Sequence, residues 1–319
     1  METSVQLVDM IRAFYNNDKD LFFKTALQIA DQEAQSGHGA IAHEIKRLLK
    51  NSKAQVNPSI TYEKTLKDIL DDISIVLKPE ERLGELIQNV QLKNDLKYLL
   101  HEYRERAKIL AHGLSPRRKI LLRGASGTGK SLTARIIAGE LHLPLYTIFI
   151  DKIVTDAASA KLKELFTVIH KNRGVYFFDY FHAIGLEHYM NHDIRATNYV
   201  LHIFLQLLEQ DRSDSIILVA TNADKSLDRA ILQRFDDILD FTLPDTASIE
   251  ELLLNRLVGY WENTPYMQSL VRVAMGLTHA EITQACNNVI KYAILNNQKR
   301  VEDLSIQEAI AAIQSKYAR

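Results

Sequence analysis

Cysteine is almost missing from this chain, and neither sign of charge prevails. Cys286 is the only cysteine among 319 residues, which excludes a disulfide within the chain. Its context, AEITQACNNVI, favours packing in a helix over reactivity. Lysine plus arginine number 39, and aspartate plus glutamate number 40. This balance gives no electrostatic case for nucleic acid or an anionic membrane as the main partner.

Long apolar runs are missing as well. No stretch approaches the roughly 18 apolar residues that a membrane helix needs, and the opening METSVQLVDM lacks the basic segment and apolar run of a signal peptide. We therefore expect a cytoplasmic protein with no membrane partner. The chain has no internal repeat or low-complexity segment, and its apolar fraction of 46% is that of ordinary globular proteins.

Residues 1–52 have the pattern of a small helical bundle. Three apolar stripes with helical spacing are separated by turn-forming residues at 16–18 and 36–39. The polar, proline-containing stretch that follows predicts a linker over 53–60. Because a bundle of short helices seldom carries chemistry by itself, we interpret residues 1–52 as a docking segment.

The middle of the chain changes its period. The pattern is helical from residue 61 to 113, and short apolar runs separated by helical segments follow. The runs are 120–122, 145–150, 175–178, 216–220 and 238–243. This alternation predicts an α/β fold over 61–244, in which a parallel five-stranded sheet is covered by helices on both faces.

The last segment, 245–319, has the pattern of a small helical domain. Capping boxes, in which Ser or Thr is followed three residues later by Glu, begin at Ser248, Thr278 and Ser305. We expect each box to open a helix.

A glycine-rich segment after the first predicted strand carries the strongest functional signal. Residues 124–131, GASGTGKS, match the P-loop pattern G-x-x-x-x-G-K-S. Its glycines let the backbone wrap a phosphate chain, and the N–H groups of the turn and of the next helix point at the anion. Lys130 would reach the β- and γ-phosphates, and the Ser131 hydroxyl would bind Mg²⁺. The strand-like ILLR before it and the helical LTARIIAGEL after it argue against a chance match.

Three polar residues follow later apolar runs. Asp179 ends a strand beside the P-loop, where an aspartate can hold the water shell of Mg²⁺, although alone it would be a turn former. Asn222 can orient water against a γ-phosphate, although asparagine is also common at strand ends. Arg234 by itself is most often a solvated surface charge.

Taken together, these motifs resemble a known family. The segments ILLRGASGTGKS, VYFFDYFHAIG, ILVATNAD, LDRAILQRFDDIL and GLTHAEI, in this order and spacing, resemble those of AAA+ ATPases, and among them the AAA clade. The resemblance runs from about Thr61 to the C-terminus. It is greatest to small bacterial AAA ATPases that join an N-terminal helical segment to one AAA module. Some of these are paired with a subtilisin-like serine protease in defence-type two-gene systems.

The resemblance implies a P-loop NTPase fold with a C-terminal helical lid and with ATP and Mg²⁺ as ligands. It also implies a ring, usually a hexamer, formed by this chain alone or with an active AAA subunit. It assigns Asp179, with Ser131, to the metal, Asn222 to sensor 1 and Arg234 to the arginine finger that completes a neighbour's site. The implied nucleotide contacts are Gly124, Ala125, Ser126, Gly127, Thr128, Gly129, Lys130, Ser131 and Leu132, with Gly276, His279 and Ala280 of the lid.

The family pattern is broken at the position after Asp179. Relatives carry a glutamate there that polarises the attacking water, whereas this chain has Tyr180, a phenol whose pKa of about 10 makes it a poor base at neutral pH. His182 replaces the next acid and has a suitable pKa for a base, if it reaches the site. Gln233 stands where relatives often carry a second arginine. Residues 151–160 lack the aromatic residue and glycine with which AAA unfoldases grip substrate.

Three functions follow from these observations. The favoured one is an Mg-ATP-binding protein that hydrolyses ATP weakly and uses it to control assembly or docking of a protein partner. The alternative is a fully active ATPase or remodeller that uses another base. The third, less favoured, is a nucleic-acid-linked AAA+ protein. The one basic cluster worth noting, 117–119, is better interpreted as a flank of the P-loop strand than as a DNA-reading surface.

Overall fold

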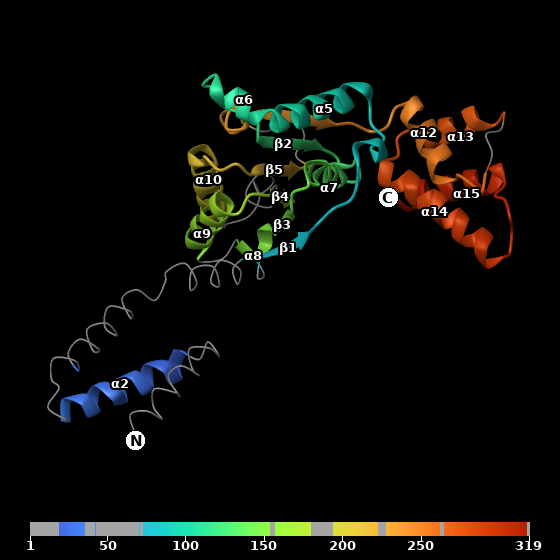
Figure 1. Ribbon diagram of the computed structural model, residues 1–319. Helices are drawn as coiled ribbons and strands as arrows, with labels where there is room; N and C mark the ends of the chain where they lie inside the picture. The colour runs from blue at the N-terminus through green and yellow to red at the C-terminus, as the bar shows by residue number, and fades with distance from the viewer. Residues whose placement is uncertain are drawn as a thin grey trace. The chain divides into compact units, whose positions relative to one another are not determined.

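A computed structural model describes residues 19–35, 42, 70, 73–153, 157–179, 194–222, 228–261 and 265–317. The chain divides into two compact units, Met1–Asp68 and Ile69–Arg319. In the first unit, helix α2 (Lys19–Gln35) buries Ala26, Ile29 and Ala30, which share one helical face (Figure 1). Apart from Ala42, the rest of the predicted bundle and the whole predicted linker lie outside the described residues.

The second unit is built on a mixed sheet whose strand order is β1-β3-β4-β5-β2-β6. Strands β2 to β6 pair with one another in parallel, and β1 pairs antiparallel with β3. The bounds are β1 Ser74–Leu77, β2 Lys119–Gly124, β3 Leu145–Phe149, β4 Val175–Asp179, β5 Ile216–Thr221 and β6 Asp237–Phe241. The five predicted parallel strands are therefore all present.

Strand β1 is a sixth strand in a segment whose pattern predicts helix. Its residues, SIVL, are buried only at Ser74, and the other three side chains are exposed. The strand exists because its backbone pairs with β3, from Ser74 opposite Ile148 to Leu77 opposite Leu145. An edge strand of four residues, with no apolar face to bury, leaves too little periodicity for a sequence pattern to detect.

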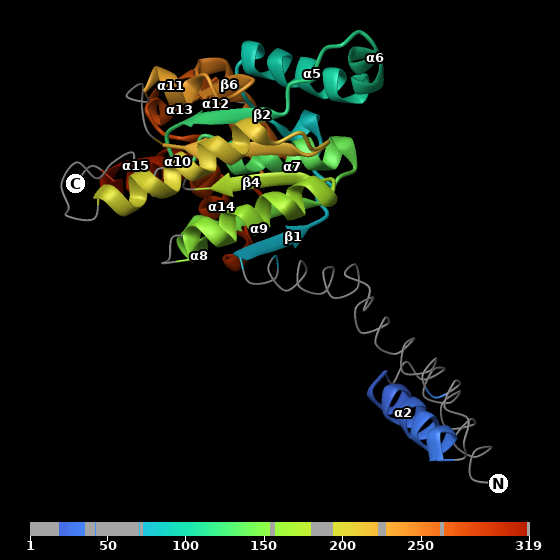
Figure 2. The ribbon, with the colours of Figure 1, turned by 90° about the vertical axis from the view of Figure 1, so that its left-hand side faces the viewer.

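Helices cover both faces of the sheet, as predicted (Figures 1 and 2). On one face, α5 (Val90–Arg104) and α7 (Lys130–Leu141) pack on a core that includes Ile120, Leu122 and Leu218. On the other face, the ring of Phe204 in α10 lies edge-on to Phe178 of β4 and to Phe166 of α9. The other helices of the α/β part are η1 Leu83–Glu85, α6 Arg106–Ala111, α8 Ile150–Ile153, α9 Ala158–Lys171, α10 Ile194–Gln210 and α11 Arg229–Leu232.

Four helices form the C-terminal part, at one end of the sheet (Figure 1). They are α12 Thr246–Arg256, α13 Met267–Ala274, α14 His279–Leu295 and α15 Asp303–Tyr317. They have a hydrophobic core of their own. Cys286 lies in that core, and burial raises the pKa of its thiol to about 11, so it packs and does not react. No helix among the described residues is long and apolar enough to cross a membrane.

One of the three predicted capping boxes is confirmed. The Thr278 hydroxyl accepts from the Glu281 N–H, and the Glu281 carboxylate accepts from the Thr278 N–H. The other two predictions are wrong in position. Helix α12 begins earlier, because the Asp245 carboxylate caps it by accepting from the Ser248 N–H at 2.8 Å, and α15 begins two residues before Ser305, at Asp303.

Candidate functional site: a phosphate cradle under a helical lid

The glycine-rich loop joins the end of β2 to the start of α7. Gly124, Gly127 and Gly129 all have positive φ angles of 151°, 77° and 108°. At Gly124 a Cβ atom would lie 2.1 Å from the backbone oxygen of Phe241 in β6, so only glycine lets the chain turn here. Gly129 then caps α7, whose free N–H groups point at the loop and favour an anion.

Lys130 is buried at the base of this loop with neutral partners. Its ammonium group donates to the carbonyl oxygens of Gly124 at 2.5 Å and Ala125 at 2.8 Å, and to Oδ1 of Asn222 at 2.8 Å. Burial lowers the pKa of Lys130, and the charge of Asp179 partly offsets this. An anion in the loop would stabilise the charged ammonium, as phosphate does.

Ser131 and Asp179 come together from different elements. The Ser131 hydroxyl, in the first turn of α7, donates to Oδ2 of Asp179 at the end of β4 across 3.4 Å. A hydroxyl and a carboxylate beside a phosphate site are the few protein ligands that Mg²⁺ requires, since it keeps most of its water shell. Both therefore fit the predicted metal role, and a Mg²⁺ ion held there would neutralise phosphate charge.

The lid contacts the P-loop directly. The Ala280 N–H, in the first turn of α14, donates to the carbonyl oxygen of Gly127 at 3.0 Å. A Cβ atom at Gly127 would come within 2.8 Å of the Thr278 hydroxyl, so this contact requires the glycine. Gly276, with φ of 88°, makes the turn that precedes α14.

His279 lies beside Ala280 and is only 8% exposed. Neither ring nitrogen makes a hydrogen bond within the described part of the chain. Burial is the main cause that lowers the pKa of His279. The charge of Asp245 and the nearby Ile87 backbone act in the opposite direction. The imidazole is therefore neutral at pH 7.

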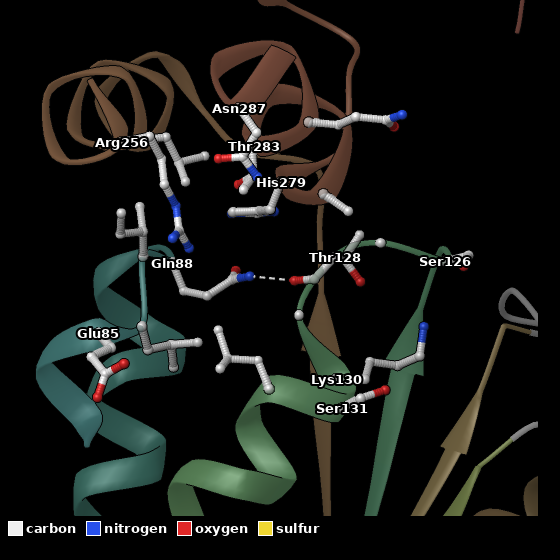
Figure 3. Close-up of a pocket in the computed structure, with 18 of the residues that line it drawn as sticks. Glu85, Gln88, Ser126, Thr128, Lys130, Ser131, Arg256, His279, Thr283 and Asn287 are labelled. Atoms are coloured by element: carbon white, nitrogen blue, oxygen red, sulfur yellow. Dashed lines mark hydrogen bonds between the residues drawn. The ribbon is translucent and has the colours of Figure 1, made fainter. Parts of the chain in front are cut away.

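A cavity of about 500 Å³ joins these parts (Figure 3). At one end it is lined by Lys130, Ser131, Asp179 and Asn222, and residues 126–132 form its floor. Of the predicted lid contacts, His279 and Ala280 line it, whereas Gly276 does not. Gly124 and Ala125 act through the carbonyl groups that hold Lys130.

Sequence reasoning missed the residues at the other end of the cavity. Those that line it there include Gln88, Leu252, Arg256, Thr283 and Asn287. Gln88 is 4% exposed, and its Nε2 donates to the carbonyl oxygen of Thr128 at 2.5 Å. The available signal was a glutamine in the apolar turn ELIQ, directly before Asn89, which caps α5.

Comparison with known proteins identifies the domain that holds this cavity. Residues 120–243 match the family described as "ATPase family associated with various cellular activities (AAA)". This chain carries a domain of the AAA+ superfamily.

Relatives and a solved structure agree with this AAA domain. An uncharacterised AAA family ATPase, y4kL of Sinorhizobium fredii, is 27% identical over 318 residues, 96% of this chain and 94% of that protein. The ATP-dependent zinc metalloprotease FtsH of Helicobacter pylori is 29% identical over 247 residues, but these are only 39% of its length and 73% of this chain. The crystal structure of the FIGL-1 AAA domain shares the fold, with a TM-score of 0.63 at 18% identity, over 83% of this chain and 97% of that one.

Arg234 lies apart from the cavity of the AAA domain. It follows α11 and forms an ion pair with Glu209 of α10, and both side chains are exposed. Arg234 and Glu209 line a second hollow, of about 430 Å³, between α10 and α11. Gln233, the residue before it, ends α11. Arg234 does not line the cavity of its own chain. Its position is compatible with a contact to nucleotide bound by a neighbouring subunit.

The basic cluster at 117–119 is held by acidic residues and carbonyl groups. Arg117 pairs with Glu102 at 2.7 Å and with Asp237, and Arg118 is buried against Asp211. The Lys119 ammonium contacts the Glu209 carbonyl oxygen at 3.5 Å, and burial is the main cause that lowers its pKa. These side chains are therefore engaged in contacts within the fold.

Tyr180 and His182 lie outside the described residues, since the description stops at Asp179 and resumes at residue 194. The shortened loop predicted at 151–160 is described except for residues 154–156. Helix α8 follows β3 without a break, and α9 begins at Ala158.

Proposed function

We propose that this protein binds ATP with Mg²⁺, hydrolyses it weakly, and uses the bound nucleotide to control assembly or the docking of a protein partner. The observation that carries the proposal is the contrast between a complete phosphate site and an incomplete hydrolytic one. Lys130, Ser131 and Asn222 converge at one end of the cavity with Asp179. The position directly after Asp179, where a water-activating acid is expected, holds Tyr180.

The cradle favours phosphate binding for a definite physical reason. A triphosphate supplies the negative charge that the buried Lys130 ammonium lacks, and the α7 N-terminus adds its N–H groups. Ser131 and Asp179 would hold Mg²⁺ against the phosphates. FtsH, which matches this chain in part, is named as ATP-dependent, and this supports ATP as the nucleotide.

Weak hydrolysis follows from acid–base chemistry. A base for the attacking water must be deprotonated near neutral pH and within hydrogen-bond reach. A phenol does not meet the first condition. Asn222 remains available to orient water, and Arg234 of a neighbouring subunit would stabilise charge on the transferring phosphoryl group.

The test is ATP affinity measured beside ATP turnover, with and without Mg²⁺. We expect Mg-dependent binding with turnover near background, and we expect Tyr180→Glu to create activity. Tyr180→Phe is the matched control, because it keeps the ring and removes only the hydroxyl, and it should stay inactive. If the protein turns over ATP at ordinary AAA rates and His182→Ala abolishes this turnover, the proposal is wrong. The alternative, a fully active ATPase that uses His182 as its base, would then be established.

We further propose that residues 1–52 dock the partner, that residues 61–244 and 245–319 act as the nucleotide-binding domain and its lid, and that the protein works in the cytoplasm as a ring. The contact between Ala280 and the P-loop supports coupling of the lid to nucleotide. A subtilisin-like serine protease is the first partner to test. Deletion of residues 1–52 should abolish co-purification of the partner and leave ATP affinity unchanged; an unchanged complex would show that docking lies elsewhere.

A further inference from the structure

The region around helix α6 has not been assigned a role. It lies across the sheet from the C-terminal helices (Figure 1), where α5 ends at Arg104 and α6 follows. The loops before β4 and β5 meet it there, because the Tyr103 hydroxyl donates to the Asp214 carbonyl oxygen and accepts from Nε of Arg173 at 3.1 Å. None of these residues lines the cavity of the P-loop, so this region is separate from the nucleotide site.

Two arginines converge on the Tyr103 ring. The guanidinium carbon of Arg106 lies 5.2 Å from the ring centroid, and that of Arg173 lies 5.4 Å from it. Tyr103 is 1% exposed, so its ring is a fixed support for both cations. Within the described part of the chain, neither arginine forms an ion pair, and the terminal nitrogens of Arg173 have no hydrogen-bond partner.

Other arginines close to this ring do have carboxylate partners. Arg104 pairs with Glu140 at 2.8 Å, and Arg117 pairs with Glu102 at 2.7 Å. The fold therefore supplies carboxylates to arginines in this region but leaves Arg106 and Arg173 without one. Two cations placed on one ring repel each other, and an anion that contacts both relieves this repulsion.

Exposed leucines lie beside these cations. Helix α6 buries none of its residues, and Leu110, four residues after Arg106 and so on the same helical face, is 51% exposed. Leu114 is 65% exposed. It is fixed at the end of α6, because Gly113 turns the chain with a φ of 74° and the Leu114 N–H donates to the Ile109 carbonyl oxygen at 3.2 Å.

We propose that Arg106, Leu110, Leu114 and Arg173, here called the α6 surface, dock a segment of a protein partner that carries both carboxylates and apolar side chains. The carboxylates complement the two arginines, and the free fork of Arg173 suits a carboxylate that accepts two hydrogen bonds. The leucines lose their contact with water in the complex. This inference goes beyond the nucleotide function and adds a second contact to the one proposed for residues 1–52.

The surroundings of the α6 surface favour a protein over nucleic acid or an anionic membrane. Glu105, next to Arg106, and Asp214, at the Tyr103 hydroxyl, are both exposed. They repel a continuous row of phosphates, which carries one charge per about 1.7 Å of duplex. A peptide, in contrast, places its carboxylates only opposite the arginines, and its apolar side chains cover the leucines that a row of phosphates leaves in water.

The experiment measures binding of the full chain to a fluorescent amphipathic peptide of glutamate and leucine. One control peptide replaces leucine by alanine, and another replaces glutamate by glutamine. A DNA duplex and phosphatidylserine vesicles are the non-protein probes. We expect the glutamate–leucine peptide to bind at least about tenfold more tightly than either control peptide, and its affinity to fall as salt is added.

Variants of the α6 surface locate the binding. Arg106→Gln and Arg173→Gln should each weaken the glutamate–leucine peptide about tenfold. Arg272→Gln, at an exposed arginine of α13, makes the same change in net charge and should have no effect. Leu110→Ser should weaken this peptide but not the one without leucine. Arg173→Lys keeps the charge and should lose less affinity than Arg173→Gln, which keeps the inference testable if the glutamine variant unfolds.

Four results would overturn the inference. They are an equal loss in Arg272→Gln, peptide binding that no variant of the α6 surface changes, binding of DNA or vesicles that the arginine variants weaken, and self-association that these variants abolish in sedimentation. The last two would assign the α6 surface to phosphate groups or to a second copy of the chain. Every variant should bind ATP as the unmodified chain does, and absence of ATP binding in the unmodified chain would overturn the proposed function alone.

Discussion

Positively charged side chains lie at both ends of strand β2, but their hydrogen-bond and ion-pair partners differ. At the start of the strand, Arg117 and Arg118 are ion-paired with Glu102, Asp237 and Asp211. After its end, Lys130 is held by two carbonyl oxygens and the Asn222 amide, and forms no ion pair among the described residues. The strand thus joins a closed end, whose charges are ion-paired, to an open end, where Asp179 only partly offsets the cost of burying the Lys130 charge.

This difference shows where an anion belongs. A buried charge with a paired carboxylate is satisfied by the fold itself, whereas a buried charge with only neutral partners retains a desolvation cost that an incoming anion relieves. Asp236 fastens the closed end further, because its carboxylate accepts from the backbone N–H groups of Arg118 and Lys119 at 2.9 Å. The closed end stabilises the sheet, and the open end is available for phosphate.

Breaking the closed end should have the largest effect. Arg118→Met leaves Asp211 buried without its counter-ion, and the free energy of unfolding should fall by about 3–5 kcal/mol. Urea denaturation measures this. The folded fraction should bind ATP with unchanged affinity, and Lys108→Met, at an exposed lysine on α6, should change stability by less than about 0.5 kcal/mol. A loss below about 1 kcal/mol for Arg118→Met would contradict the assignment of a structural role.

Breaking the open end should affect binding and spare stability. Lys130→Met should weaken ATP binding about a hundredfold, because charge-assisted hydrogen bonds to phosphate are lost. Its unfolding free energy should stay constant or rise, since burial lowers the pKa of Lys130 and so opposes its charge in the folded chain. Titration with a fluorescent ATP analogue, beside Lys119→Met as the control, tests the contrast. Equal losses of affinity in both variants would remove the distinction between the two ends.

The same contrast explains what could be predicted from the sequence. The P-loop and its neighbours Asp179 and Asn222 were recognisable because a local glycine pattern and successive strand ends mark them. The parallel strands were recognisable because each contains a short apolar run, continuous and fully buried in β5 and interrupted by the exposed Asp240 in β6. Both signals are contained in short windows of the chain.

What the sequence could not show depends on distant partners. The residues around Arg118 do not indicate that it pairs with Asp211, which lies 93 residues away in the sequence. Likewise, the residues around Gln88 do not indicate its hydrogen bond to Thr128, which lies 40 residues away. The acidic partners of the basic cluster were therefore not predicted, and the residues at the other end of the cavity were missed. Strand β1 escaped detection because its backbone pairing, and not its side-chain pattern, determines it.

The pH dependence of stability tests His279, the buried lid residue that lines the cavity at the open end of β2. The pKa of His279 is lowered in the folded chain, chiefly by burial, with Asp245 and the Ile87 backbone acting against this. As pH falls through about 6.5, the unfolded chain takes up a proton that the folded chain refuses, so stability declines. His279→Gln should reduce this decline by up to about 1.4 kcal/mol per pH unit, measured by urea denaturation between pH 7 and pH 5. An identical reduction in His101→Gln, at an exposed position on α5, would refute the assignment to His279.

A small effect on stability is expected at the exposed pair of Arg234 and Glu209, which resembles neither end of β2. Because both side chains are exposed, Glu209→Gln should lower the free energy of unfolding by less than about 1 kcal/mol. Its consequence should lie between subunits, because the variant frees the guanidinium that we propose acts on a neighbour. Sedimentation with and without ATP should show self-association promoted by ATP in Glu209→Gln and lost in Arg234→Ala. If Arg234→Ala assembles normally, Arg234 has a structural role within its own chain, as Arg118 has.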